Sequence, residues 1–210
     1  MLHTIRVQFN EELRGAGLPF VAFSIALNLT AGQLAAAIKL PIYLDSLGTV
    51  LTAVLCGPWS AIVAGVFSNV LASAFGSPTM MFFIPVMVVI GAFTGFIARH
   101  GWFRRWYLVP FAGIVQGVLA ALVSAPIAAY LFSGVMLAGT DIVVLYFRSV
   151  GNTLLQSVLF QGLSSDPVDK TVTYVLVYLL CRRLPMRLLQ RFHGGNNIVT
   201  PTQVRRRYAL

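Results

Sequence analysis

The sequence predicts an all-α membrane protein with six transmembrane helices and both termini in the cytoplasm. The chain is 58% hydrophobic and only 10% charged, whereas a soluble domain carries about 25% charged residues. Apolar runs recur along nearly the whole chain and do not alternate with polar residues as barrel strands do. Helices are therefore expected, because they satisfy their own backbone hydrogen bonds in lipid. The arginines gather on one side of these runs, which gives the orientation.

The chain begins with a polar lead-in at residues 1–17, which carries four charged residues and no early apolar core, so we expect no cleavable signal peptide. The first span is predicted at residues 18–38 and ends at Lys39-Leu40-Pro41. Two apolar runs follow at 43–57 and 59–75, joined by Gly57-Pro58-Trp59. Each is shorter than the ~20 residues of a straight span. They predict a hairpin of short helices, around which the other helices pack.

The second half of the chain begins with a span at 79–98, closed by a basic run at 99–105, and a span at 106–132. In the connector, 133–170, we expect a short helix at 141–150 capped by Thr140-Asp141, and a second one reaching residue 163. Ser164-Ser165-Asp166-Pro167 is typical of a turn and a helix start. The sixth span is predicted at 168–184. Residues 18–184 would thus form one membrane domain, followed by a basic tail at 185–210 with a mobile end.

The positive charges test this count of spans. Twelve of the 15 Lys and Arg residues fall in the termini and in the turns on the same side. The other side has Lys39, Arg148 and Lys170, together with four of the six acids: Asp45, Asp141, Asp166 and Asp169. The positive-inside rule then places both termini in the cytoplasm. The net charge of +9 accordingly indicates membrane orientation rather than a nucleic-acid partner.

Polar residues within or beside the spans fall mainly on the outer side, where they are candidates for a substrate pocket. The candidates are Lys39, Tyr43, Asp45, Asn69, Arg148, Asn152, Gln156, Asp169 and Lys170. Each also has a structural interpretation: Lys39 as a snorkelling side chain, Asp45 as a helix cap, and Asp169 and Lys170 as charges at a helix start. Asn152 and Gln156 could bond a neighbouring helix. Tyr43, Tyr130 and Tyr174 could stack on a ring of the ligand.

Catalytic motifs are missing from the sequence. HExxH, GxSxG, a Cys/His cluster and a Walker A motif are all absent, and no histidine lies inside a predicted span. We therefore expect no enzymatic activity, no metal and no cofactor. Active transport would take its energy from a partner or an ion gradient.

Two alanines give the first span a second feature. Ala22 and Ala26 lie one helical turn apart, and Ala31 and Ala35 repeat the spacing. Small residues at this spacing let another helix approach closely in lipid. The pair is either an internal packing face or a docking surface for another membrane subunit.

The chain resembles the S component, the substrate-binding subunit, of an energy-coupling factor (ECF) transporter. The resemblance covers most of residues 18–184. It is carried by Ala22-xxx-Ala26, by LPIYLDSLGTVLTAVLCGPWSAIVAGVFSN at 40–69, and by SSDPVDKTVTYVLVYL at 164–179.

The resemblance implies six helices with cytoplasmic termini in the bacterial cell membrane. It implies high-affinity binding of a vitamin or similar micronutrient from outside. The partners would be a transmembrane coupling subunit, docked on Ala22 and Ala26, and two cytoplasmic ATPase subunits. The pocket and its gate would correspond to residues 39–45, Asn69, Asp169 and Lys170. Charges of both signs favour a polar or zwitterionic ligand, whose identity stays open.

Two other classes of function remain. A stand-alone ion-coupled carrier would show an inverted repeat and charges at the bilayer midplane, and the sequence has no clear repeat. A membrane enzyme would use Asp45, Asp166 and Asp169 as acidic ligands for a divalent metal.

Overall fold

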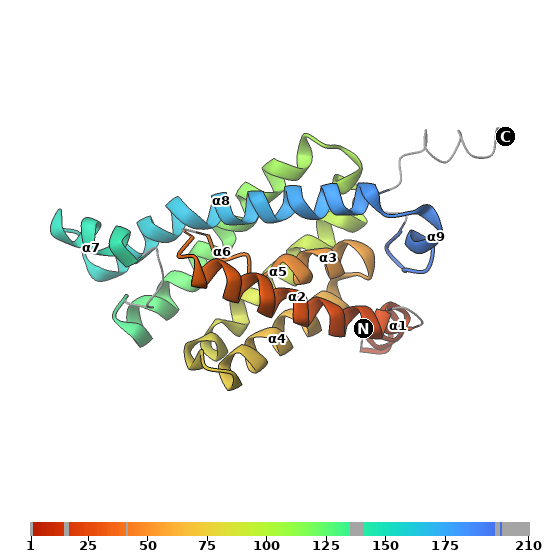
Figure 1. Ribbon diagram of the computed structural model, residues 1–210, viewed down its shortest axis with the longest axis horizontal. Coiled ribbons are helices and arrows are strands. Elements are labelled where there is room, and N and C mark those ends of the chain that lie inside the picture. The colour runs from red at the N-terminus through yellow and green to blue at the C-terminus, as the bar shows by residue number, and fades with distance from the viewer. Residues whose placement is uncertain (1, 15–16, 41, 135–140, 196–197, 199–210) are drawn as a thin grey trace.

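The computed structural model describes residues 2–14, 17–40, 42–134, 141–195 and 198, whose regular secondary structure is entirely helical (Figure 1). Three of its segments are long and apolar enough to cross a membrane. They are α2 (Gly17–Ala37), the run of η1 (Pro78–Phe83) into α5 (Ile84–Arg99), and α6 (Leu108–Phe132). The predicted all-α membrane class is confirmed at this level.

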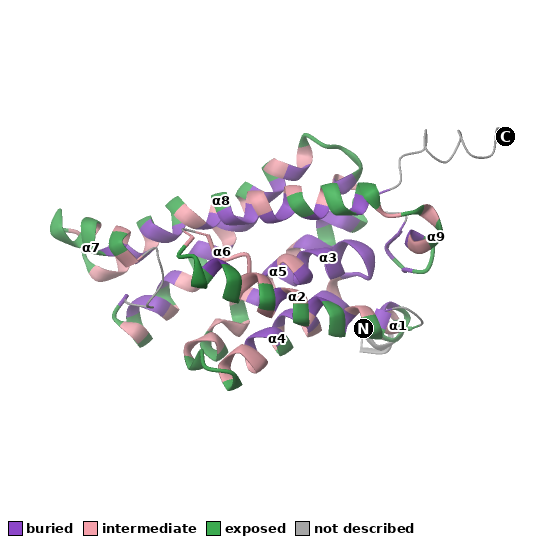
Figure 2. Ribbon diagram, viewed as in Figure 1, coloured by how far each residue is buried: buried purple, intermediate pink, exposed green. Residues whose placement is uncertain are grey.

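The short hairpin predicted at 43–75 is present and central. α3 (Leu47–Leu55) is buried from Gly48 to Leu55, which makes it the most enclosed helix of the bundle (Figure 2). α4 (Pro58–Ala74) follows directly after Gly57, which has φ +130°. A side chain at Gly57 would collide with the carboxylate of Glu12, so this tight turn needs glycine. α3 packs against α2, α4, α5 and α8 (Leu154–Arg183).

Both hairpin helices have their first N–H groups satisfied by side chains from earlier in the chain. The Asn28 carboxamide oxygen accepts from the Gly48 and Thr49 amides at 2.6 and 3.3 Å. Glu12 Oε2 accepts from the Ser60 amide at 2.9 Å. Unpaired N–H groups at a buried helix start are costly, so these two side chains stabilise a hairpin that could not cap itself.

α8 contradicts the predicted connector. It is one continuous helix of 30 residues, beginning at a capping box in which Thr153 and Gln156 bond each other's amides. The predicted helix ending at residue 163 is its first part, and the predicted turn at Ser164–Pro167 lies inside it. The short helix at 141–150 is present as α7 (Asp141–Ser149). The capping pair Thr140-Asp141 lies partly outside the described residues.

Pro167 lies inside this helix although it has no N–H to donate to the Leu163 carbonyl. The Ser164 and Ser165 hydroxyls donate to the carbonyls of Phe160 and Gln161, one turn back, at 2.6 and 3.2 Å. Serine hydroxyls and neighbouring helices are what allow proline within membrane helices. Gly117 of α6 lies very close to Pro167. A Cβ added at Gly117 would be 2.3 Å from the Cα of Pro167. The antiparallel α6–α8 pair is the most extensive helix contact of the fold.

The two ends of the described chain meet at the same end of the bundle, where α1 (Leu2–Leu13) and α9 (Met186–Leu189) lie (Figure 1). The Gly194 amide donates to the Leu55 carbonyl at 2.7 Å, and Phe192 is buried against the core. The beginning of the basic tail is therefore part of the fold. Of the end that we expect to be mobile, 194–210, Gly194 makes this hydrogen bond and Ile198 is buried, while 196–197 and 199–210 lie outside the described residues.

The apolar core has two parts. The larger joins α3 and α5 to the first turns of α6 and the last turns of α8. The smaller joins the end of α6 to α7 and the start of α8. Between them, α6 and α8 carry buried polar residues, and the candidate site lies in this interval.

Candidate functional site

Buried charged residues from α8 meet the start of α3 in what we call the ion cluster: Asp45, Ser46, Asp166, Asp169 and Lys170. The Lys170 ammonium donates to Asp169 Oδ2 at 2.7 Å and to the Ser46 hydroxyl at 2.8 Å. Asp45 Oδ1 lies 3.5 Å from the same nitrogen. The side chains of Asp169 and Lys170 are 0% and 5% exposed. Such a pair is tolerable only because each charge has several partners.

Asp169 also holds the loop between α2 and α3. Its Oδ1 accepts from the backbone amides of Tyr43 and Leu44, both at 2.9 Å. Leu44 has φ +52°, a conformation that is costly for a non-glycine residue. Two charge-assisted hydrogen bonds offset that cost. The loop is thus fastened to the middle of α8 by one carboxylate.

A second set of contacts extends the cluster towards the start of α8. The Gln161 amide donates to the Tyr43 hydroxyl at 3.3 Å and to the Ser165 hydroxyl at 2.8 Å. The Ser165 hydroxyl, which also bonds the Gln161 carbonyl, lies 3.3 Å from Asp166 Oδ1. All three α8 residues and Tyr43 are at least partly buried.

The cluster has more carboxylates than ammonium groups, since Lys170 faces Asp45, Asp166 and Asp169. Asp45 is the accessible one, with a side chain that is 32% exposed. Because its contact with Lys170 is long, the exposed carboxylate oxygens of Asp45 can still accept hydrogen bonds from a ligand. Chemically, the arrangement can accept hydrogen bonds from a polar or positively charged group of a ligand.

Two further polar side chains in the same interval of α6 and α8 are completely buried. Neither the Gln116 amide group nor the Thr173 hydroxyl has a hydrogen-bond partner among the described residues. Unsatisfied buried polar groups are rare, and water or a ligand commonly completes them. They add two unsatisfied polar groups to the interval between the two apolar cores.

Of the nine predicted site residues, the structure brings Tyr43, Asp45, Asp169 and Lys170 together. The other five lie elsewhere. Lys39, after α2, and Arg148, at the end of α7, are exposed. The Asn69 and Asn152 amides donate to the carbonyls of Met80 and Phe147. Gln156 completes the α8 capping box.

The tyrosines proposed to stack on a ligand separate in the same way. Tyr130 is 76% exposed on α6, and Tyr174 is fully buried, bonded to Thr94 and packed beside Phe103. Only Tyr43 adjoins the cluster. Ser46 and Gln161 were missed as site residues, and Asp166 was expected only as a metal ligand of a membrane enzyme. The spacing of Asp166, Asp169 and Lys170 puts them on one face of a helix that runs through Pro167. The prediction of a helix start at Pro167 separated Asp166 from the other two.

The predicted docking pair on α2 faces outward. Ala22 and Ala26 are exposed, whereas Ala35 of the repeated spacing is buried. Exposed Phe23 lies beside Ala22 on the same helix. A second helix could therefore contact Ala22 and Ala26 without any rearrangement of this bundle.

Comparisons with protein-family models, with curated proteins and with solved structures found no match to this chain. Among the described residues, no group of three His, Cys, Asp or Glu side chains is arranged to hold a metal ion. The two cysteines, Cys56 and Cys181, are buried and unpaired. The function therefore has to be argued from the geometry of the ion cluster and its surroundings.

Proposed function

We propose that this chain is the S component of an ECF-type importer, a membrane subunit that binds a vitamin-like molecule from outside the cell. The observation that carries the proposal is the ion cluster. A costly set of charges lies inside an apolar bundle, fastened to a loop and open to solvent only at Asp45. Ionisable groups inside a membrane bundle usually mark a binding site or pathway.

In this role the chain would cross the membrane six times, through α2, α4, the η1–α5 run, α6, α8 and the nine-residue α3, whose crossing would be completed by the loop before it. An even number puts both ends of the domain on one side, as the arginine distribution requires. The loop at 42–46 would then face the outside with Asp45, and the hydrogen bonds from Tyr43 and Leu44 to Asp169 would keep it over the site. A ligand that displaces the loop would have to replace those two bonds.

Energy for import would come from separate subunits, since the sequence has no Walker A motif. The exposed face of α2 around Ala22 and Ala26 would contact the coupling subunit. Small side chains there allow the close helix approach that drives association in lipid. Two ATPase subunits would complete the complex in the cytoplasm.

The test is to purify the chain in mild detergent and identify co-purifying small molecules by mass spectrometry. We expect one bound compound per chain, and at least about tenfold less of it in Asp45→Asn, since a hydrogen bond to a charged group contributes about 1.5–3 kcal/mol. Asn152→Ala is the matched control, because that amide bonds the Phe147 carbonyl instead. No bound compound, or equal amounts in both variants, would contradict the proposal.

A second candidate is a stand-alone ion-coupled carrier, and one observation favours it. Asp166, Asp169 and Lys170 lie near the middle of the 30-residue α8 rather than at a helix end, and midplane charges are typical of such carriers. Proteoliposomes that contain this chain alone distinguish the two. Accumulation of the co-purified compound under an ion gradient, without ATPase subunits, would favour the carrier.

A further inference from the structure

The turn between α5 and α6 joins two of the three helices that are long enough to cross a membrane. If both cross, the turn lies at a membrane surface. Residues 100–107 contain Arg104 and Arg105 and no carboxylate. Arg99, just before them, donates to Glu12 Oε1 at 2.6 Å and is therefore already paired.

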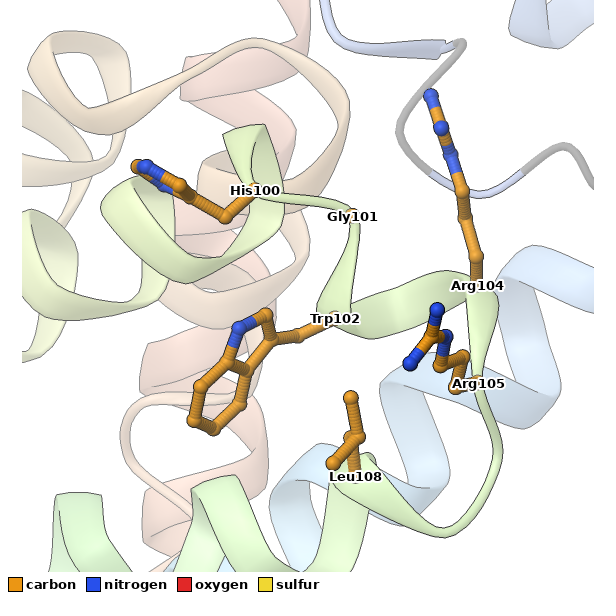
Figure 3. Close-up of a pocket in the computed structure, with 6 residues that line it drawn as sticks. All are labelled: His100, Gly101, Trp102, Arg104, Arg105 and Leu108. Carbon is orange, nitrogen blue, oxygen red and sulfur yellow. The ribbon is translucent and has the colours of Figure 1, made fainter.

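A hollow of about 240 Å³ opens on this turn (Figure 3). It is lined by His100, Gly101, Trp102, Arg104, Arg105 and Leu108. Gly101 has φ +76°, which turns the chain sharply and lets Arg104 extend beside its Cα. Arg105 points toward Trp102 and Leu108, with a long hydrogen bond to the Tyr107 hydroxyl at 3.4 Å.

The basic hollow continues into an exposed apolar surface on both helices. Phe96 of α5 is 59% exposed and packs against His100, with ring centroids 4.3 Å apart and ring planes tilted by 42°. Phe111 of α6 is 54% exposed and stacks with Trp102 at 6.2 Å. Trp106 is also exposed, as interfacial aromatic residues are at the level of the headgroups.

We propose that this turn is a binding site for an anionic phospholipid of the inner leaflet. Its phosphate would lie in the hollow against Arg105, and its acyl chains would lie along Phe96 and Phe111. Guanidinium groups bind phosphate oxygens with charge-assisted hydrogen bonds, and basic pockets between membrane helices select acidic headgroups. The exposed rings of Phe96 and Phe111, each in contact with a residue that lines the hollow, favour a lipid over a soluble phosphate. The inference rests on the membrane location and on the proposed orientation, and it is independent of the transported substrate.

The experiment uses the full chain in lipid nanodiscs, with Trp59→Phe and Trp106→Phe so that Trp102 is the only tryptophan, excited selectively over the tyrosines. Emission is compared in discs that contain equal fractions of brominated phosphatidylglycerol or brominated phosphatidylcholine. We expect about twofold stronger quenching by the anionic lipid, and equal quenching by both lipids in Arg105→Gln. Arg187→Gln on α9 is the control, because it removes an exposed arginine from the same end of the bundle.

A preference that Arg105→Gln leaves intact would overturn the proposal, as would equal quenching in the starting protein. Loss of the preference on adding millimolar inorganic phosphate would assign the hollow to a soluble anion and would also overturn it. If the variant with Trp59→Phe and Trp106→Phe does not fold, the fallback experiment is native mass spectrometry of the chain that retains all three tryptophans. Retained phosphatidylglycerol should then fall in Arg105→Gln and persist in Arg187→Gln.

Discussion

At the scale of single residues, buried charges are the costliest groups in this protein, and Asp169 and Lys170 each have several partners. Asp169 combines one ammonium group with two backbone amides. Lys170 combines two carboxylates with a hydroxyl. Removing one member of such a set leaves the others buried without compensation, which costs far more than the intact set contributes.

Asp169→Ala is therefore expected to lower the free energy of unfolding by about 3–5 kcal/mol. The substitution leaves the ammonium of Lys170 and the amides of Tyr43 and Leu44 short of an acceptor. Denaturant unfolding in detergent micelles measures the change. Lys39→Ala, at the exposed end of the same loop, should stay within about 0.5 kcal/mol. Equal stability of both variants would show that the loop is not held by Asp169.

Glu12 is the corresponding residue at the opposite end of α3. Its carboxylate is buried, accepts from the Ser60 amide and pairs with Arg99. Burial nevertheless raises the pKa of Glu12 above its ordinary value of 4.5, since loss of solvation outweighs the hydrogen bonds and the arginine. The folded state thus holds this proton more tightly than the unfolded state does.

The sign of the pH dependence follows from linkage. This group contributes most to stability below pH 4.5, and the contribution falls as pH rises from there through the higher folded pKa. Glu12→Gln cannot titrate, so the stability of wild type relative to this variant should decrease over that window. Unfolding curves of the two proteins at several pH values give the difference. A wild-type advantage that grows with pH would mean that the Arg99 pair dominates.

At the scale of elements, short and long helices are stabilised by different means. α3 and α4 depend on caps from Asn28 and Glu12, which lie on preceding elements. α8 caps itself at Thr153 and depends on α6 to cover its proline turn. Gly113 and Gly117 on α6 allow that close approach, since each faces the α8 backbone.

Gly117→Ala should accordingly destabilise the protein by about 1–3 kcal/mol. The added methyl group would meet the backbone at Pro167, which cannot move aside as a flexible side chain could. Leu122→Ala, on the exposed side of α6, is the control and should change stability little. Thermal unfolding in detergent compares the two. A stabilised Gly117→Ala would mean that α6 and α8 can separate slightly without cost.

At the scale of the whole molecule, two apolar cores are separated by a polar interval, and the two ends of the described chain converge on the α3–α4 turn. If the bundle lies across a membrane as proposed, α7 and the turn after it face outward, and α9 faces the cytoplasm. Labelling of single cysteines tests this directly, because Cys56 and Cys181 are buried and should react little.

Intact cells that express Ser149→Cys should react with a membrane-impermeant maleimide, since Ser149 is exposed at the end of α7. Cells that express Gln190→Cys, exposed just after α9, should react only after permeabilisation. Mass spectrometry of the purified protein counts the label. The reverse pattern would invert the orientation and remove the basis for an outward-facing site.

The sequence by itself determined the helical membrane class and the bounds of most helices to within a few residues, because apolar length and turn residues act locally. It also indicated Asp45, Asp169 and Lys170. Only the tertiary structure decided that α8 continues through Pro167, in a turn against which α6 packs closely at Gly117. It also separated Asn152 and Gln156 from the cluster and added Asp166, Gln161 and Ser46. Those assignments depend on which helix lies opposite each side chain, and that is a property of packing rather than of local sequence.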